Sequence, residues 1–256
     1  EEIYILSCLG SPTRGVIGYV DAARVGPDAH PGHFDKCLTS VLRFQIYNNV
    51  WWHNDPDCSY LAPKLESRKV GYTHQGEGMW KTWHNIVTLV GGTAMNSEPL
   101  DAEDCKAVWR NAEIMRPSSA EPGRLLTLGL SPENTIFGFA AARPYGDFAV
   151  WNFYNSAKDP KSITLDFTAG GLPPDIECAV FDFWQNKVIA RAKDTFTTAA
   201  LDNESSALLR FTPLNSTGPV LVGSNLHLAP GATEIQDIRT MPKLLEVVLT
   251  DAGAQS

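Results

Sequence analysis

The 256-residue sequence lacks the apolar run of about 18 residues that a membrane-spanning helix requires. It also lacks a clustered stripe of Lys and Arg, and its formal net charge is −8. Phosphate binding needs concentrated positive charge, so we expect neither nucleic acid nor a membrane as a partner. No basic segment precedes the first apolar one, so no signal peptide is visible, and there is no initiating Met. The opening run at 3–8 therefore suggests a processed chain or a cut through a larger protein.

Cysteine is sparse, and no two cysteines have the C-x-x-C spacing typical of a zinc site. A dense disulfide framework is not expected in a chain of this length, although one or two bridges remain open. We predict no metal and no cofactor. Sequons at Asn203 and Asn215 are compatible with an extracellular location, but they occur at about the chance frequency and do not establish one. The five cysteines are Cys8, Cys37, Cys58, Cys105 and Cys178.

Residues 1–117 alternate short apolar segments with longer segments of helical spacing, the rhythm of parallel α/β units. The predicted strands are 3–8, 16–24, 49–54 and 93–97. The predicted helices are 34–44, 79–90 and a third that is capped by Asp101 and ends before Pro117. A closed (β/α)₈ barrel needs eight such units, and about four are present. The segment therefore reads as the C-terminal half of a barrel, about strands 5–8, or as a small open sheet.

Residues 134–240 contain short alternating segments separated by turn residues, the pattern of an antiparallel β-sandwich. A linker rich in Pro, Ser and Gly is predicted at 118–133, and a tail at 241–256. The fold class is thus α/β followed by all-β. The predicted strands are 135–142, 148–155, 162–168, 177–184, 187–192, 206–214 and 220–228.

Polar loops follow the predicted strands of the first half, where α/β barrels carry their chemistry. In Arg-Val-Gly-Pro-Asp, Gly26 permits the turn and Pro27 stiffens it, so Asp28 projects from a rigid loop close to Arg24. Carboxylates beside an Arg suit acid/base chemistry on a sugar. The alternative is an ordinary solvated Asp28.

Asp55 and Asp57 flank Pro56 directly after an aromatic strand, which is unusual for a plain turn. The alternative is that they cap the next helix or bind nearby backbone N–H groups. Trp51 and Trp52 point to opposite faces if the segment is a strand, so one of them, taken here as Trp52, is predicted to face a sugar.

Four segments carry a family resemblance in their order and spacing: LSCLGSP at 6–12, GYVDAARVGPD at 18–28, WWHNDPDC at 51–58 and LVGGTAMNSEPL at 89–100. They resemble retaining α-galactosidases of the melibiase type, in glycoside hydrolase family 36 and the related family 27. The stretch from 180 to 238 resembles the β-sandwich that follows the barrel in those enzymes. The resemblance implies a half-barrel plus sandwich and an α-galactoside substrate.

The resemblance also implies residue roles. Asp28 matches the general acid/base, and Arg24 matches the Arg that contacts sugar hydroxyls. Cys8 lies in the strand-end segment that contacts galactose, so it would bind rather than react. Asp55 and Asp57 match the motif that shapes the pocket floor.

One part of the family pattern is missing. The nucleophilic Asp of these enzymes follows the fourth barrel strand, upstream of LSC, so in this interpretation the chain starts at strand five and its partner is the N-terminal half of the barrel. We therefore expect the 256-residue chain alone to be inactive and the half-barrel to be poorly stable. The alternatives are a galactosyl-transferring or α-N-acetylgalactosaminidase relative, and a non-catalytic carbohydrate-binding remnant.

Overall fold

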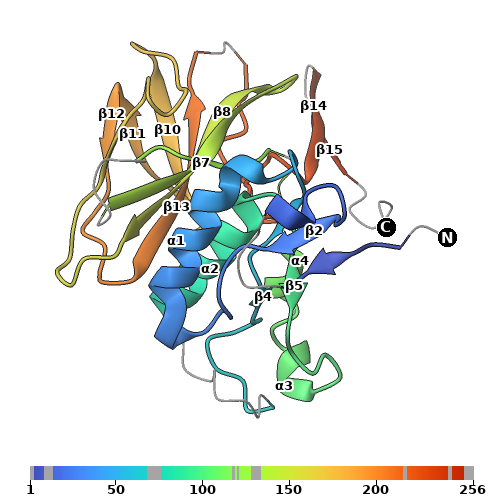
Figure 1. The fold of residues 1–256 in the computed structure, drawn as a ribbon. Helices are drawn as coiled ribbons and strands as arrows, with labels where there is room; N and C mark the ends of the chain where they lie inside the picture. The colour runs from blue at the N-terminus through green and yellow to red at the C-terminus, as the bar shows by residue number, and fades with distance from the viewer. Residues whose placement is uncertain are drawn as a thin grey trace. The chain divides into compact units, whose positions relative to one another are not determined.

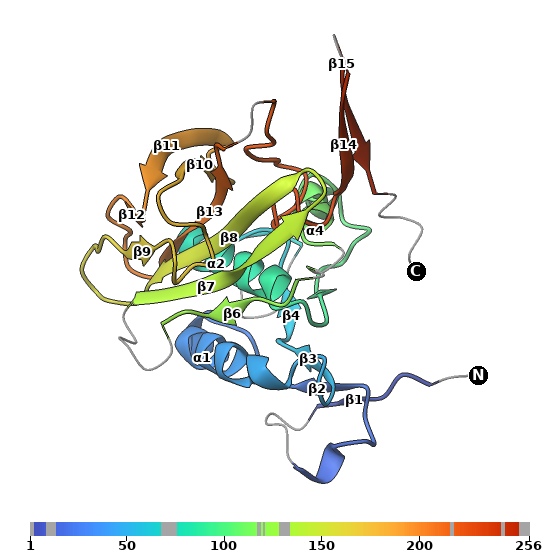
Figure 2. The same cartoon turned by 90° about the horizontal axis from the view of Figure 1, so that it is seen from above.

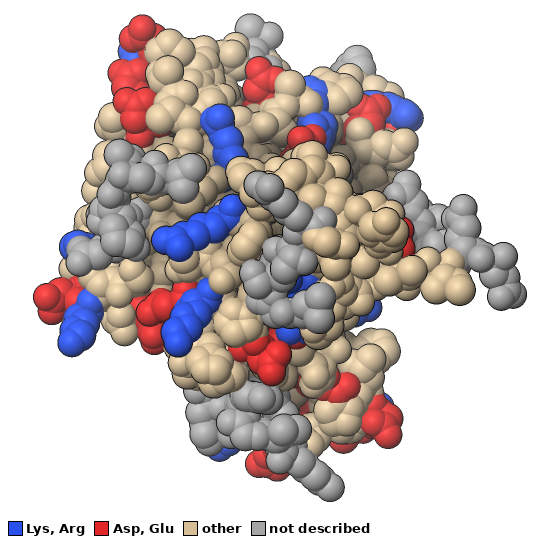
Figure 3. Space-filling model, in the orientation of Figure 1, with Lys and Arg blue, Asp and Glu red and all other residues tan. Residues whose placement is uncertain are grey.

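The computed structural model describes residues 3–8, 14–67, 76–116, 119, 121–127, 134–215, 218–241 and 244–250. The chain divides into two compact units, Glu1–Arg124 and Leu125–Ser256, which are described separately (Figure 1). All five cysteines are free thiols. Within the described ranges, no helix has the length and apolar character needed to cross a bilayer. Acidic and basic side chains are interspersed on the face shown in Figure 3.

Every strand pairing described in the first unit is parallel. β1 (Leu6–Ser7), β2 (Ala22–Arg24) and β3 (His53–Asp55) form a sheet in that order, and β4 (Cys58–Ser59) pairs with β5 (Met95–Asn96). The strands are much shorter than the sequence predicts: of the strand predicted at 16–24, residues 22–24 form β2, and Val16 belongs to the 3-10 turn η1 (Arg14–Val16). Parallel strands place their carboxyl ends on one edge of a sheet, and this edge carries the predicted site.

The helices of the first unit follow the predicted apolar spacing. α1 (Phe34–Phe44) lies between the turns η2 (Pro31–His33) and η3 (Gln45–Tyr47), and α2 (Glu77–Leu89) buries most of its side chains. Gly91, at φ +66°, ends α2 in the left-handed conformation that favours glycine. The predicted single helix from Asp101 is wrong: α3 (Glu103–Lys106) and α4 (Arg110–Glu113) are separate, and Ala102 is the cap residue.

The second unit is built on an antiparallel sheet, which confirms the antiparallel prediction for β7 through β13. The sheet order is β11 (Lys187–Lys193), β10 (Glu177–Asp182), β13 (Ser205–Pro213), β8 (Gly146–Asn155), β7 (Asn134–Arg143) and β6 (Arg124–Leu125). Figure 2 shows β7 and β8 side by side. A short pair, β9 (Thr164–Asp166) with β12 (Thr195–Thr197), contributes Leu165 and Phe196 to the same core as Trp151 and Phe211.

The strand predicted at 220–228 is wrong. The backbone over 220–228 is loop and bend, and the carbonyl oxygen of Leu221 accepts hydrogen bonds from the Arg210 and Thr212 side chains. The last strands are instead β14 (Ile235–Met241) and β15 (Leu244–Leu249), which form an antiparallel hairpin.

Candidate functional site

The carboxyl edge of the three-stranded sheet brings five of the six predicted site residues together. Arg24 is the register partner of Asp55, and Ser7 pairs with Ala23, which places the exposed Cys8 beside Arg24. Asp28 and Asp57 lie in the loops that follow β2 and β3. The convergence follows directly from the parallel pairing.

Arg24 lies at the centre of this cluster and contacts all three aspartates. Its Nε donates to Asp55 Oδ2 at 3.0 Å, Nη2 lies 2.8 Å from Asp57 Oδ1, and Nη1 lies 3.4 Å from Asp28 Oδ1. Burial lowers the pKa of Arg24, but the hydrogen bond and charge of Asp55, with the charges of Asp57 and Cys8, outweigh it and raise the pKa above its usual value. The guanidinium is therefore a fixed positive charge.

Asp55 and Asp57 are occupied by protein donors. The Asp55 side chain is 0% exposed, and its Oδ1 accepts from the backbone N–H of Asp57. Asp57 Oδ1 accepts from the N–H of Cys58, and Oδ2 accepts from the N–H of Ala29 at 2.7 Å. Asp57 adopts φ +81°, and its carboxylate reaches the loop that follows β2. Both carboxylates thereby hold Arg24 and the loop that carries Asp28.

The Asp28 side chain is 78% exposed, although its loop is held firmly. The Cys37 thiol of α1 lies 3.5 Å from the carbonyl oxygen of Pro27 and 3.3 Å from that of Asp28. Burial raises the pKa of Cys37 to about 11, so the thiol remains a donor. A Cβ on Gly26 would lie 3.2 Å from Ser40 Cβ, so the loop packs closely on α1. The Asp28 carboxylate thus extends into solvent from a fixed backbone.

Trp52 is not brought to this edge. It lines a cleft of about 480 Å³ with Tyr4, Asp21 and Trp51, residues that precede the strands, so the cleft lies at their amino ends. Its indole N–H donates to Asn54 Oδ1 at 3.0 Å. Trp51 stacks on Tyr47 with the rings 4.3 Å apart.

The supporting role of two residues, Asn54 and Asn48, was not predicted from the sequence. The fully buried Asn54 donates to the carbonyl oxygen of Phe44, and its own N–H donates to Asn48 Oδ1 at 2.8 Å. Asn48 Nδ2 in turn donates to the carbonyl oxygen of Val90. These bonds tie β3 to the ends of α1 and α2. The available signal was an Asn within an aromatic strand, since a buried amide must find partners.

In the described part of the chain, no group of three His, Cys, Asp or Glu side chains is placed to bind a metal ion. His30 and His33 lie with their rings 4.0 Å apart, but His30 Nδ1 accepts from the N–H of Gly32.

No family model matches the sequence, but solved structures share its fold. A family 27 β-L-arabinopyranosidase from Geobacillus stearothermophilus matches with TM-score 0.60 and 11% identity over 78% of this chain and 46% of that chain. The α-galactosidase I of Mortierella vinacea matches with TM-score 0.52 and 11% identity over 75% of this chain and 53% of that chain. A putative α-N-acetylgalactosaminidase from Bacillus halodurans matches with TM-score 0.58 and 12% identity over 80% of this chain and 48% of that chain.

The chain therefore spans about half the length of these solved structures. At such low identity the likeness shows a fold shared with part of family 27 α-galactosidases and related glycosidases. The assignment to family 36 stays a prediction.

Proposed function

We propose that this chain contributes the acid/base part of a retaining glycosidase site that removes terminal α-galactosyl residues. In this proposal the first unit is the C-terminal half of a (β/α)₈ barrel, and the second is the sandwich that follows it. The observation that carries the proposal is the Arg24 cluster, with its three aspartates at the carboxyl ends of parallel strands. The fold shared with α-galactosidases supports it.

Asp28 is proposed as the general acid/base, because it is the exposed carboxylate of the cluster. A second carboxylate, expected upstream of β1 in the whole protein, attacks the anomeric carbon. The glycosidic C–O bond breaks, and Asp28 gives its proton to the leaving oxygen. Asp28 then takes a proton from water, whose oxygen attacks the same carbon and releases the sugar with retained configuration.

Arg24 is proposed to bind sugar hydroxyls beside Asp28, with Cys8 on its other side. Asp55 and Asp57 act as positioning residues, because their oxygens already accept hydrogen bonds from Arg24 and from backbone N–H groups. Trp52 is left out of the proposed site. A site fixed in this way keeps the acid and the hydroxyl-binding cation in one geometry before substrate arrives.

The test uses the whole natural protein that contains this chain, with Asp28→Asn compared with Asp101→Asn, a change at an exposed carboxylate in another loop. We expect Asp28→Asn to lose at least about a hundredfold in turnover of aryl α-galactosides, while Asp101→Asn keeps wild-type turnover. Azide, a nucleophile that needs no deprotonation, should restore turnover of Asp28→Asn with an activated leaving group and give an α-galactosyl azide.

A substrate panel of aryl α-galactoside, β-L-arabinopyranoside and α-N-acetylgalactosaminide, with and without an acceptor sugar, distinguishes hydrolysis from transfer and ranks the sugars. Full activity of Asp28→Asn would refute its role as acid/base. Sugar binding without turnover by the whole protein would instead favour a non-catalytic carbohydrate-binding module. We expect the 256-residue chain alone to show no turnover.

A further inference from the structure

Arg210 of β13 is a charged side chain buried inside the second unit, with only 1% of the residue exposed. Its Nε donates to Thr212 Oγ1 at 3.0 Å, Nη2 to the carbonyl oxygen of Leu221 at 3.0 Å, and Nη1 to that of Pro230. A guanidinium carries five N–H donors. These three bonds leave one N–H on each terminal nitrogen without a partner among the described residues.

The Arg210 charge also lacks a direct counter-ion. No carboxylate lies within 4.0 Å of it in the part of the chain that the structure describes, and the Phe148 ring lies 3.8 Å below the guanidinium carbon. Glu234 Oε1 accepts from the N–H of Gly231 at 2.8 Å, and its buried Oε2 has no hydrogen-bond partner among the described residues, so Glu234 acts on Arg210 through its charge alone. Burial lowers the pKa of Arg210 to about 10, despite the charges of Tyr145 and Glu234. A buried cation without a paired anion is costly and calls for a compensating ligand.

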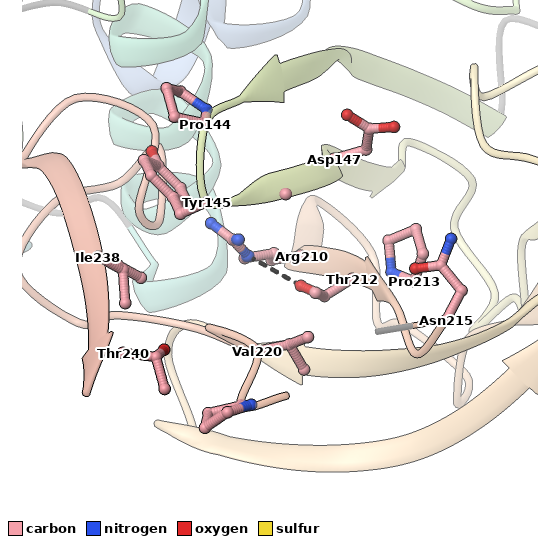
Figure 4. Close-up of a pocket in the computed structure, with 12 residues that line it drawn as sticks. Pro144, Tyr145, Asp147, Arg210, Thr212, Pro213, Asn215, Val220, Ile238 and Thr240 are labelled. Carbon is pink, nitrogen blue, oxygen red and sulfur yellow. Dashed lines mark hydrogen bonds between the residues drawn. The ribbon is translucent and has the colours of Figure 1, made fainter. Parts of the chain in front are cut away.

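A cleft of about 310 Å³ reaches this guanidinium (Figure 4). Its walls are Pro144, Tyr145, Pro213, Pro219, Val220 and Ile238, and its polar groups beside Arg210 are Asp147, Thr212, Asn215 and Thr240. In Figure 4 the Asp147 carboxylate points away from Arg210, whereas Arg210 extends toward Tyr145 between the cleft walls. Apolar walls with a few convergent polar groups are typical of a small-molecule site.

The groups around the cleft are fixed before any ligand arrives. The Tyr145 hydroxyl donates to the carbonyl oxygen of Gly231. Gly231 adopts φ +78°, and a Cβ there would collide with Arg210 Nη1, so only glycine allows the guanidinium this place. Arg210 is therefore held by the sheet on one side and by the loop on the other.

We propose that this cleft binds a small ligand that carries one carboxylate group. The planar fork of a guanidinium matches the two oxygens of a carboxylate, and each terminal nitrogen has one N–H to give. A single negative charge is favoured over a dianion such as phosphate, because Asp147 and Glu234 lie nearby. The carboxylate can belong to a simple organic acid or to an acidic sugar, and the residues that line the cleft include none of the Arg24 cluster.

The test is calorimetric titration of the whole 256-residue chain with acetate, glucuronate, methyl glucuronate ester, glucose and phosphate. We expect saturable binding of acetate or glucuronate and none of the neutral ester or of glucose. Equal affinity for both acids identifies a bare carboxylate as the ligand group, and tighter binding of glucuronate identifies an acidic sugar. Absence of carboxylate binding, equal binding of ester and acid, or binding of phosphate alone would overturn the proposal.

The location of the binding site is tested without changing Arg210, because Arg210 also holds the loop that contains Leu221 and Pro230. Thr240→Glu puts a negative charge in the cleft wall, which repels a carboxylate, and should weaken carboxylate binding at least about tenfold. Thr195→Glu, at an exposed Thr of β12, is the matched control and should bind as the wild type does. Melting curves confirm that both variants are folded. Equal binding by both variants would place the ligand elsewhere and overturn the assignment of this cleft.

Discussion

Arg24 neutralises a carboxylate that has no access to water. The Asp55 side chain is 0% exposed, so Arg24→Met leaves its charge buried, with the backbone N–H of Asp57 as its one remaining donor among the described residues. We expect a loss of about 3–5 kcal/mol in the free energy of unfolding, measured by denaturant titration with tryptophan fluorescence. The double change Arg24→Met with Asp55→Asn should recover part of it.

Asp28→Asn is the control for that measurement. Because the Asp28 side chain is 78% exposed, its removal should change the free energy of unfolding by less than about 0.5 kcal/mol. If Arg24→Met cost no more than Asp28→Asn, the Arg24–Asp55 pair would not stabilise the edge of the sheet. Stability and activity thus separate the positioning residues from the proposed acid.

His84 makes the first unit sensitive to acid. It is buried in α2, its Nδ1 lies 3.0 Å from the carbonyl oxygen of Trp80, and burial lowers its pKa from 6.5 to about 4. Between pH 4 and pH 6.5, the His84 imidazole is protonated in the unfolded chain and neutral in the native state. The free energy of unfolding should therefore be fully present above pH 6.5 and fall by about 2–3 kcal/mol as the pH drops to 4.

His84→Gln removes this titration while it keeps an N–H donor for the Trp80 carbonyl. The loss between pH 6.5 and 4 should shrink accordingly in denaturant titrations at each pH. His53→Gln, at an exposed histidine, should retain the wild-type loss. The same pH slope in His84→Gln and the wild type would show that another group controls acid stability.

Among the elements, β7 depends on the absence of a side chain at Gly138. A Cβ there would overlap the carbonyl oxygen of Val150 on the paired strand β8, so backbone must move. We expect Gly138→Ala to destabilise the second unit by about 1–3 kcal/mol in thermal or denaturant unfolding. Gly170→Ala is the milder comparison, because its Cβ would meet side-chain atoms of Leu165 and Trp151 at 3.2 Å. Equal losses would contradict this ranking.

Elements defined by local pattern were predictable, and elements defined by distant partners were not. The 3.6-residue spacing of apolar side chains located α1 and α2, whereas β1 and β2 extend only as far as their neighbours pair with them. The 220–228 segment alternates like a strand, but its Leu221 carbonyl oxygen accepts hydrogen bonds from the side chains of Arg210 and Thr212. The hairpin of β14 and β15 is largely exposed, so it lacks the apolar alternation that identifies a buried strand.

The residues of the candidate site were likewise predictable only in part. Arg24, Asp28, Asp55 and Asp57 could be grouped from the sequence, because parallel strands bring their carboxyl ends to one edge. Alternation along a strand indicates a face and not an end, so the position of Trp52 could not be predicted in this way. No local pattern in the sequence indicated the cleft at Arg210, because the residues that line it come from four separate segments of the chain.

At the scale of the whole molecule, the two units differ in the sheet on which each is built. The second unit has a continuous core that includes Trp151, Phe153, Phe167 and Phe211, all fully buried. The sheet of β1, β2 and β3 is small, and β1 has no strand partner on its outer side among the described residues. Apolar side chains are exposed in both units: Ile3, Tyr4, Ile5, Tyr19, Ile46, Val50 and Trp51 in the first, and Val188, Leu244, Leu245, Val247 and Leu249 in the second.

Separate expression of the two units should therefore give opposite results. Residues 125–256 should melt cooperatively as a monomer, because that unit keeps its core and all the pairings of its antiparallel sheet except that of the short β6. Residues 1–124 should associate or lack a cooperative melt, because the sheet described in that unit has three short strands and an open edge at β1. Circular dichroism melts with sedimentation velocity on each fragment test this difference. A cooperative melt of monomeric 1–124 would show that the helices α1 and α2 stabilise the small parallel sheet without any further strand.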